Sequence, residues 1–66
     1  MTDERKLWPI VIELPDTQAW AFAEFLKRSM LDDYRARAVS QEEAYEMSAA
    51  GEAIRQALAK AGYAPR

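Results

Sequence analysis

The sequence predicts a mainly α-helical fold that begins with one short β-strand. Two long stretches, about residues 16–30 and 41–61, repeat apolar residues at the three- and four-residue spacings of an amphipathic helix. A run at about 8–14 has the two-residue period of a strand. A short middle helix is expected at about 32–38. Together these elements form one small domain, residues 7–66, after a polar arm at 1–6 that we expect to be disordered.

The expected strand has one apolar face and ends at a proline. Its inward positions are Ile10, Ile12 and Leu14. Pro15 ends the strand, because a proline has no N–H to donate to a neighbouring strand. Trp8 is interpreted as covering one end of the core, and the alternative is an exposed aromatic anchor for a partner.

The helix expected at about 16–30 follows directly. Asp16 or Thr17 can offer a side-chain oxygen to the free N–H groups of its first turn. Its buried stripe is expected to consist of Ala19, Phe22, Ala23, Leu26 and Met30. Trp20 falls almost opposite that stripe. Either the middle segment of the same chain covers Trp20, or Trp20 lies in an interface, where tryptophan is enriched.

The middle segment contains neither Gly nor Pro between residues 29 and 39, so its helix boundaries stay open. Asp32 or Asp33 can cap a helix over about 32–38, with Arg35 and Arg37 near its C-terminal end, as the helix dipole favours. The alternative is that this segment extends the preceding helix.

A capping box opens the second long helix, at about 41–61. The Ser40 hydroxyl can accept from the third N–H of the helix while Glu43 reaches back to the Ser40 N–H. The expected inner face consists of Ala44, Met47, Gly51, Ile54, Leu58 and Ala61. Because a mid-helix glycine is unfavourable without close packing, Gly51 predicts a helix crossing. Gly62 is the expected left-handed stop.

The chemistry of the side chains argues against catalysis. The chain has no His and no Cys, so the usual general base, thiol nucleophile and soft metal ligands are missing. The adjacent carboxylates of 32/33 and 42/43 do not converge on one point. We therefore expect no enzyme, no cofactor, no metal and no small-molecule substrate. No apolar run reaches the roughly 20 residues of a membrane span, so we expect a cytoplasmic protein.

A chain this small leaves much apolar surface uncovered, and without a disulfide or zinc site we expect a homodimer. The net charge is −2. The strongest local concentration of charge consists of Glu42, Glu43 and Glu46, which no basic residue follows until Arg55. Candidate partner-binding residues are Glu42, Glu43, Glu46, Trp20 and Tyr45. The alternative for the glutamates is that they complement the helix dipole. The candidates for phosphate contact are Arg5, Lys6, Arg35 and Arg37.

Residues 10–16, IVIELPD, and 51–58, GEAIRQAL, resemble the strand and second helix of the ribbon-helix-helix family of dimeric DNA-binding regulators and antitoxins. That resemblance implies a dimer whose strands pair antiparallel and face the major groove. The outward positions would be Val11 and Glu13, where that family usually has basic or amide side chains. The chain between the two blocks is also longer than the family's turn.

The whole chain is similar to short uncharacterised proteins of proteobacterial mobile elements and phages, notably in ELPDTQAWAFAEFLKR, DDYRARAV, EEAY and ALAKAGYAPR. Small acidic proteins of that setting include anti-CRISPR inhibitors, which occupy a surface of a CRISPR–Cas complex. The leading hypothesis is accordingly a non-enzymatic protein-binding factor of this kind, with a nucleic-acid-binding complex as partner. The alternative is a ribbon-helix-helix regulator or antitoxin that binds DNA.

Overall fold

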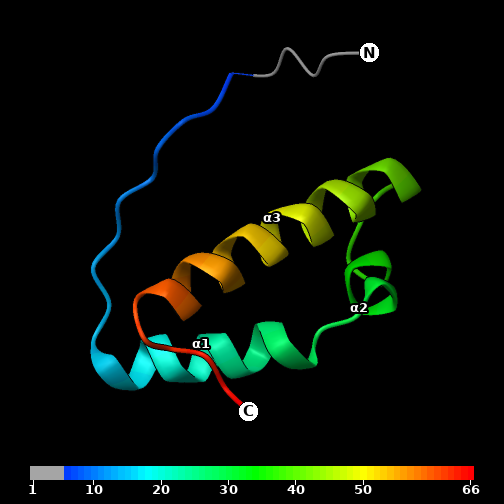
Figure 1. Ribbon diagram of the computed structural model, residues 1–66. Coiled ribbons are helices and arrows are strands. Elements are labelled where there is room, and N and C mark those ends of the chain that lie inside the picture. Colours follow the sequence, from blue (N-terminus) through cyan, green and yellow to red (C-terminus); the bar gives the residue numbers. More distant parts are fainter. Residues whose placement is uncertain (1–5) are drawn as a thin grey trace.

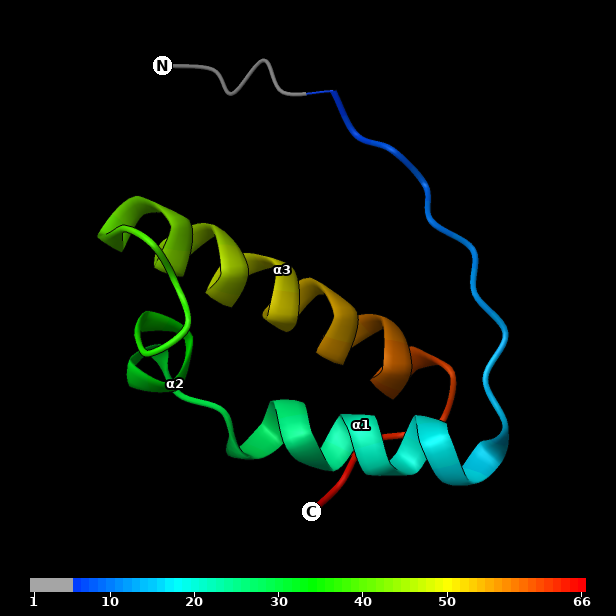
Figure 2. The same ribbon diagram turned by 180° about the vertical axis from the view of Figure 1, so that it is seen from behind.

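The structure, a computed structural model, describes residues 6–66 and places three helices in them: α1, Asp16–Arg28; α2, Leu31–Arg35; and α3, Gln41–Lys60. α1 and α3 run in opposite directions, and α2 closes the end of the hairpin between them (Figures 1 and 2). α3 packs against both α1 and α2. The mainly α-helical fold is therefore confirmed. The expected disordered arm at 1–6 lies, apart from Lys6, outside the described residues.

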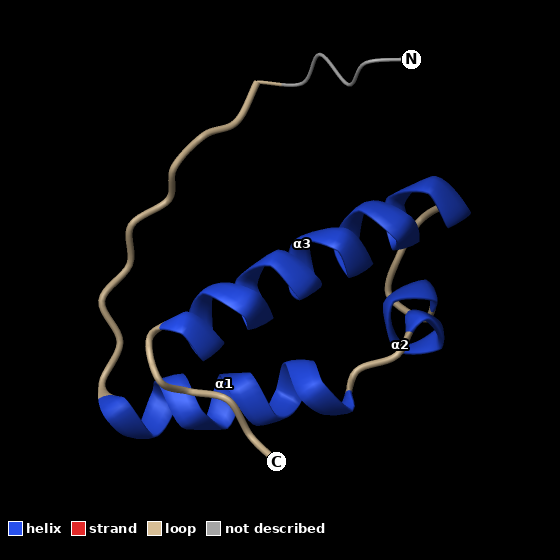
Figure 3. Cartoon of the chain, viewed as in Figure 1, coloured by secondary structure: helices blue, strands red, loops and turns tan. Residues whose placement is uncertain are grey.

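The expected β-strand at 8–14 is wrong. Residues 6–15 have no regular secondary structure, and Figure 3 shows them as a loop that leads into α1. A strand needs a neighbouring strand that hydrogen-bonds to its N–H and C=O groups. No other segment of residues 6–66 forms a strand that could pair with it. The alternation has a different cause: Ile10, Ile12 and Leu14 are 84%, 68% and 41% exposed, so they approach the helices progressively on one side.

α1 begins without the side-chain cap that Asp16 or Thr17 was expected to provide. Pro15 is its N-cap, and the Pro15 carbonyl accepts from the backbone N–H groups of Gln18 and Ala19, both at 3.0 Å. The helix ends two residues before the expected position 30. The Ser29 hydroxyl donates to the Phe25 carbonyl at 2.7 Å, and the backbone of Ser29 is already extended.

The core is built from small side chains. Ala19, Ala23 and Leu26 of α1 meet Ala44 and Gly51 of α3, and these five residues are buried. Two residues of the expected α1 stripe are not: Phe22 and Met30 are exposed. Met30 leaves the stripe because the helix stops at Arg28. Close contact between helices built on alanine and glycine leaves little interior space, so Leu26 is the largest of the five buried side chains and Phe22 lies outside.

α2 is shorter than expected and shifted. It spans Leu31–Arg35 rather than about 32–38, followed by a turn. The Asp33 carboxylate accepts from the backbone N–H of Met30 at 2.7 Å, which fixes the first turn. The expectation that Asp32 or Asp33 is the cap is therefore wrong: Met30 is the N-cap, and Asp33 acts from the third position of the helix. The alternative, that this segment extends α1, is wrong.

α3 matches its expected range to within one residue. The Ser40 hydroxyl accepts from the Glu43 N–H at 3.1 Å, while the Glu43 carboxylate accepts from the N–H of Val39 at 3.0 Å, one residue earlier than the capping box predicts. At the other end, Gly62 adopts φ 105°, the left-handed conformation expected of a helix stop. Gly51 lies at the expected helix crossing, against Tyr34 and Leu26.

Candidate functional site

Three of the expected partner-binding residues share one face at the start of α3. Glu42, Tyr45 and Glu46 stand at positions i, i+3 and i+4, which places their side chains next to one another on the helix surface. All three are exposed, and so is Val39, which precedes the helix at 88% exposure. We call Val39, Glu42, Tyr45 and Glu46 the acidic end. It combines two carboxylates with two apolar side chains.

The Tyr45 hydroxyl is held in place from two sides. It accepts a hydrogen bond from the Gln41 side-chain amide at 2.8 Å. This bond, a second one from Arg35 and the Arg35 charge lower the pKa of Tyr45 from its ordinary value. Arg35 also pairs with Asp32 at 3.2 Å. The nearest cation is therefore already engaged within the chain, and the Tyr45 ring is presented in a defined position.

Glu43, the third of the expected acidic contacts, has a structural role. Its carboxylate accepts from the Val39 N–H, and its backbone N–H donates to the Ser40 hydroxyl. The side chain turns toward the start of the helix and is only partly exposed. The acidic surface therefore depends on Glu42 and Glu46, while Glu43 fixes the helix start that positions them.

Trp20 lies at the opposite end of the molecule from the acidic end. Its ring meets the edge of Tyr63 in a T-shaped contact, with centroids 5.2 Å apart and planes at 75°. Tyr63 follows the C-terminus of α3. Tyr45 stands in the second turn of α3, which is about 22 Å from that C-terminus at the helical rise of 1.5 Å per residue. Trp20 was expected to be covered by the middle segment or to lie in an interface. The C-terminal tail covers it instead, a contact that neither interpretation included.

The Tyr63 hydroxyl also secures the start of α1. It donates to an Asp16 carboxylate oxygen at 2.7 Å, the longest-range side-chain hydrogen bond described in residues 6–66. This bond, followed by desolvation and the Asp16 charge, raises the pKa of Tyr63. The chain thus joins the N-terminus of α1 to the end of α3 through one aromatic residue.

An apolar groove of about 380 Å³ opens between residues 10–14, α1 and α3. None of its lining residues is charged: Ile10, Ile12, Leu14, Ala19, Phe22, Ile54, Ala57, Leu58, Ala61 and Tyr63. Sequence reasoning missed this groove as a site. Its signal was the alternation of residues 10, 12 and 14, which was interpreted as the inward face of a strand.

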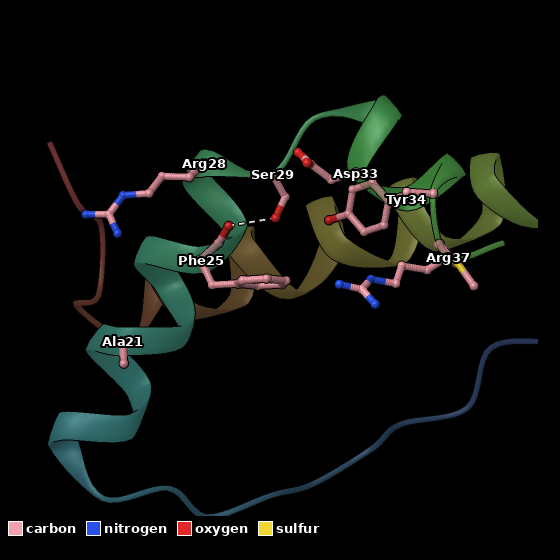
Figure 4. A pocket seen from close by; sticks show the side chains of 9 residues that line it. Ala21, Phe25, Arg28, Ser29, Asp33, Tyr34 and Arg37 are labelled. Carbon is pink, nitrogen blue, oxygen red and sulfur yellow. Dashed lines mark hydrogen bonds between the residues drawn. The ribbon is translucent and has the colours of Figure 1, made fainter.

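A second hollow, a cleft of about 480 Å³, lies between α1, α2 with the turn that follows it, and Met47 of α3 (Figure 4). The Arg37 side chain extends below the Tyr34 ring toward Phe25 (Figure 4). The end of the Arg28 side chain points away from Phe25 and Tyr34 (Figure 4). Arg28 pairs with Glu24 at 2.7 Å. Phe25 stacks on Phe22 with centroids 5.4 Å apart. The cleft is therefore lined by two arginines, Arg28 and Arg37, beside the exposed ring of Phe25.

The expected phosphate-contact residues are not gathered into one surface. Arg5 lies outside the described residues. Lys6 is on the N-terminal segment, which stands apart from α2 in both views (Figures 1 and 2). Arg35 is paired with Asp32, and Arg37 lies in the cleft. The described chain thus offers single arginines rather than a basic stripe.

Within residues 6–66 no group of three or more acidic side chains is arranged to hold a metal ion. None of the helices described there has the length and apolar character needed to cross a bilayer.

No curated protein and no solved structure matches this chain. One family profile matches it, over residues 1–66. The chain belongs to the family of unknown function DUF7706.

Proposed function

We propose that this protein is a small cytoplasmic binding factor that acts without catalysis, by placing its acidic end on a basic surface of a nucleic-acid-binding protein complex. A CRISPR–Cas complex is the partner that the mobile-element resemblance suggests. The observation that carries the proposal is the surface formed by Val39, Glu42, Tyr45 and Glu46, where two carboxylates flank a fixed tyrosine.

The composition of this surface supports binding to a protein. Tyrosine is enriched at protein interfaces, because its ring contributes apolar area at a low cost in conformational entropy. Val39 adds an aliphatic side chain that its own chain leaves uncovered. Glu42 and Glu46 supply negative charge that attracts a basic surface and orients the encounter.

The electrostatics of the helix add to the same end. Acidic side chains in the first turns of a helix are stabilised by the positive end of its dipole. Glu42 lies in the first turn of α3 and Glu46 in the turn after it, so both carboxylates add negative charge to this end of the helix. A surface made of carboxylates at the spacing of a helical turn can occupy a groove that otherwise takes phosphates.

The test is interference by a CRISPR–Cas system against a target plasmid, measured with and without the protein. Wild-type protein is expected to raise plasmid survival. Glu42→Lys is expected to reduce that effect strongly, since it replaces attraction by repulsion. Glu13→Lys is the matched control, because Glu13 is also an exposed carboxylate but lies outside the acidic end. Equal loss in both variants, or none in a folded Glu42→Lys protein, would contradict the proposal.

A titration against duplex DNA separates this proposal from the regulator alternative. The ribbon-helix-helix resemblance depends on a strand that residues 8–14 do not form, and we do not carry that function forward. We expect no binding even at low salt. Tight binding whose affinity falls steeply as salt is raised would show that phosphates are neutralised and would contradict the acidic-end mechanism.

A further inference from the structure

The cleft between α1, α2 and Met47 of α3 contains a cation that its own chain leaves unpaired. The Arg37 side chain is exposed and has neither a hydrogen bond nor an ion pair within residues 6–66. The arginines inside the three helices are each paired: Arg28 with Glu24, Arg35 with Asp32 and Arg55 with Glu52. The donors of the Arg37 guanidinium are therefore left for water or for a ligand.

Two aromatic rings border the same hollow as this guanidinium. Figure 4 shows the Arg37 side chain below the Tyr34 ring and directed toward Phe25, and all three residues line the cleft. The Tyr34 ring is held in place, because its hydroxyl lies against Gly51 of α3. Phe25 is 55% exposed although Phe22 stacks on one face of its ring. The cleft thus offers aromatic surface beside an unpaired positive charge.

The other charged side chains of the cleft are already engaged. Arg28 pairs with Glu24, and the end of its side chain points away from the two rings (Figure 4). The Asp33 carboxylate accepts from a backbone N–H at the start of α2 at 2.7 Å. Figure 4 shows that carboxylate across the Tyr34 ring from the Arg37 guanidinium. The available charge inside the cleft is therefore positive.

We propose that this cleft binds a small molecule that carries an anionic oxygen group on a planar aromatic ring. The planar fork of a guanidinium matches the oxygens of a phosphate or a carboxylate, and Arg37 supplies that fork. The ring of the ligand packs against Phe25 and Tyr34, since aromatic rings attract one another in offset or edge-to-face arrangements. The volume of about 480 Å³ lies within the range of about 300–1,000 Å³ that small-molecule sites occupy.

This site is separate from the acidic end. The residues that line the cleft do not include Val39, Glu42, Tyr45 or Glu46, so ligand binding and partner binding can be tested independently. The absence of His and Cys argues against turnover. The cleft needs neither residue type, because it holds the ligand without changing it.

The first experiment titrates isotope-labelled protein at low salt and follows the amide chemical shifts of the residues that line the cleft. Adenosine monophosphate combines a ring with a phosphate, and indoleacetate combines a ring with a carboxylate. Adenosine provides a ring without the charge, and ribose phosphate provides the charge without an aromatic ring. We expect both complete ligands to shift the cleft residues, and the two partial ligands to bind at least tenfold more weakly than adenosine monophosphate. The tighter of the two complete ligands identifies the preferred anionic group.

Two results of this titration would overturn the proposal. The first is the absence of shifts in the cleft with either complete ligand at millimolar concentration. The second is equal affinity for ribose phosphate and adenosine monophosphate, which would show attraction of any anion to a surface arginine without a contribution from the rings.

Variants then locate the contact. Arg37→Gln removes the charge, and Phe25→Leu removes the ring while keeping an apolar side chain, so each should weaken binding of adenosine monophosphate about tenfold. Arg37→Lys keeps the charge without the planar fork and should bind with intermediate affinity. Circular dichroism confirms that each variant is helical.

Arg28→Gln is the matched control. It removes the same charge from the same cleft, but at a side chain that pairs with Glu24 and points away from the rings. Its affinity for adenosine monophosphate should stay within twofold of the wild type. Equal loss in Arg28→Gln and Arg37→Gln, or unchanged binding by a helical Arg37→Gln protein, would overturn the assignment of Arg37 to the ligand.

Discussion

The Tyr34 hydroxyl of α2 lies directly against Gly51 of α3, at the point where α1 also approaches. A Cβ atom on Gly51 would clash with that oxygen and would stand 3.1 Å from Tyr34 Cζ and 3.6 Å from Leu26 Cδ2. One residue without a side chain therefore allows α2 to close over the α1–α3 hairpin. The short helix is held by this contact.

Gly51→Ala tests that contact. Alanine favours the helix by about 1 kcal/mol, whereas the clash with Tyr34 costs about 1–3 kcal/mol, so we expect a net loss of about 1 kcal/mol in the free energy of unfolding. Urea unfolding measures it. The double variant Gly51→Ala/Tyr34→Phe removes the clashing oxygen and should recover part of the loss. An alanine variant more stable than the wild type would show that Tyr34 is free to move aside.

Ser40→Ala tests the start of α3. Loss of the Ser40–Glu43 cap should cost about 1 kcal/mol of stability, because a backbone N–H loses its acceptor. Thermal unfolding measures the change, and Ser40→Asp should retain most of the stability. Because the cap also positions the acidic end, Ser40→Ala should weaken plasmid protection modestly. Equal stability of Ser40→Ala and wild type would contradict the role of the cap.

Alkaline pH tests the bond between Tyr63 and Asp16. The pKa of Tyr63 is raised above its ordinary value of 10.0 by this bond, so the folded state favours the protonated phenol. The stabilisation is complete below pH 10.0 and is lost as the pH rises through the higher folded value. As the pH is raised above 10.0, the midpoint of unfolding should fall less for Tyr63→Phe than for the wild type.

Tyr45 provides the opposite control in the same titration. Its pKa is lowered by Gln41 and Arg35, so its ionised form is favoured in the folded state and contributes stability as the pH rises through the folded value. Tyr45→Phe should therefore lose more stability at alkaline pH than the wild type. Identical pH profiles for both phenylalanine variants would contradict the assignment of the two shifts.

Acid pH tests the pair of Glu52 and Arg55 on α3. The Arg55 guanidinium donates from Nε at 2.8 Å and lowers the pKa of Glu52 from 4.5 to about 2. The stabilisation is present above pH 4.5 and disappears as the pH falls toward 2. Glu52→Gln should flatten this part of the acid unfolding curve. The effect should be small and should decrease in high salt, since the pair is exposed. A salt-independent difference would contradict an ionic origin.

The sequence by itself determined the local features of the helices. Ser40 and Gly62 mark where α3 begins and ends, because a side-chain cap and a left-handed glycine act within a few residues. Gly51 indicated a helix crossing, because a glycine in the middle of a helix is unfavourable unless another element packs closely against it. The acidic face of α3 follows from helical spacing alone.

Only the tertiary structure decided what covers each apolar residue. The alternation at Ile10, Ile12 and Leu14 is equally suited to a strand or to one wall of a groove, and the difference depends on whether a second strand exists. Trp20 meets Tyr63 of the C-terminal tail, 43 residues further along the chain. Sequence spacing carries no information about such pairs, because the contact is made by packing between distant segments rather than by the periodicity of one helix.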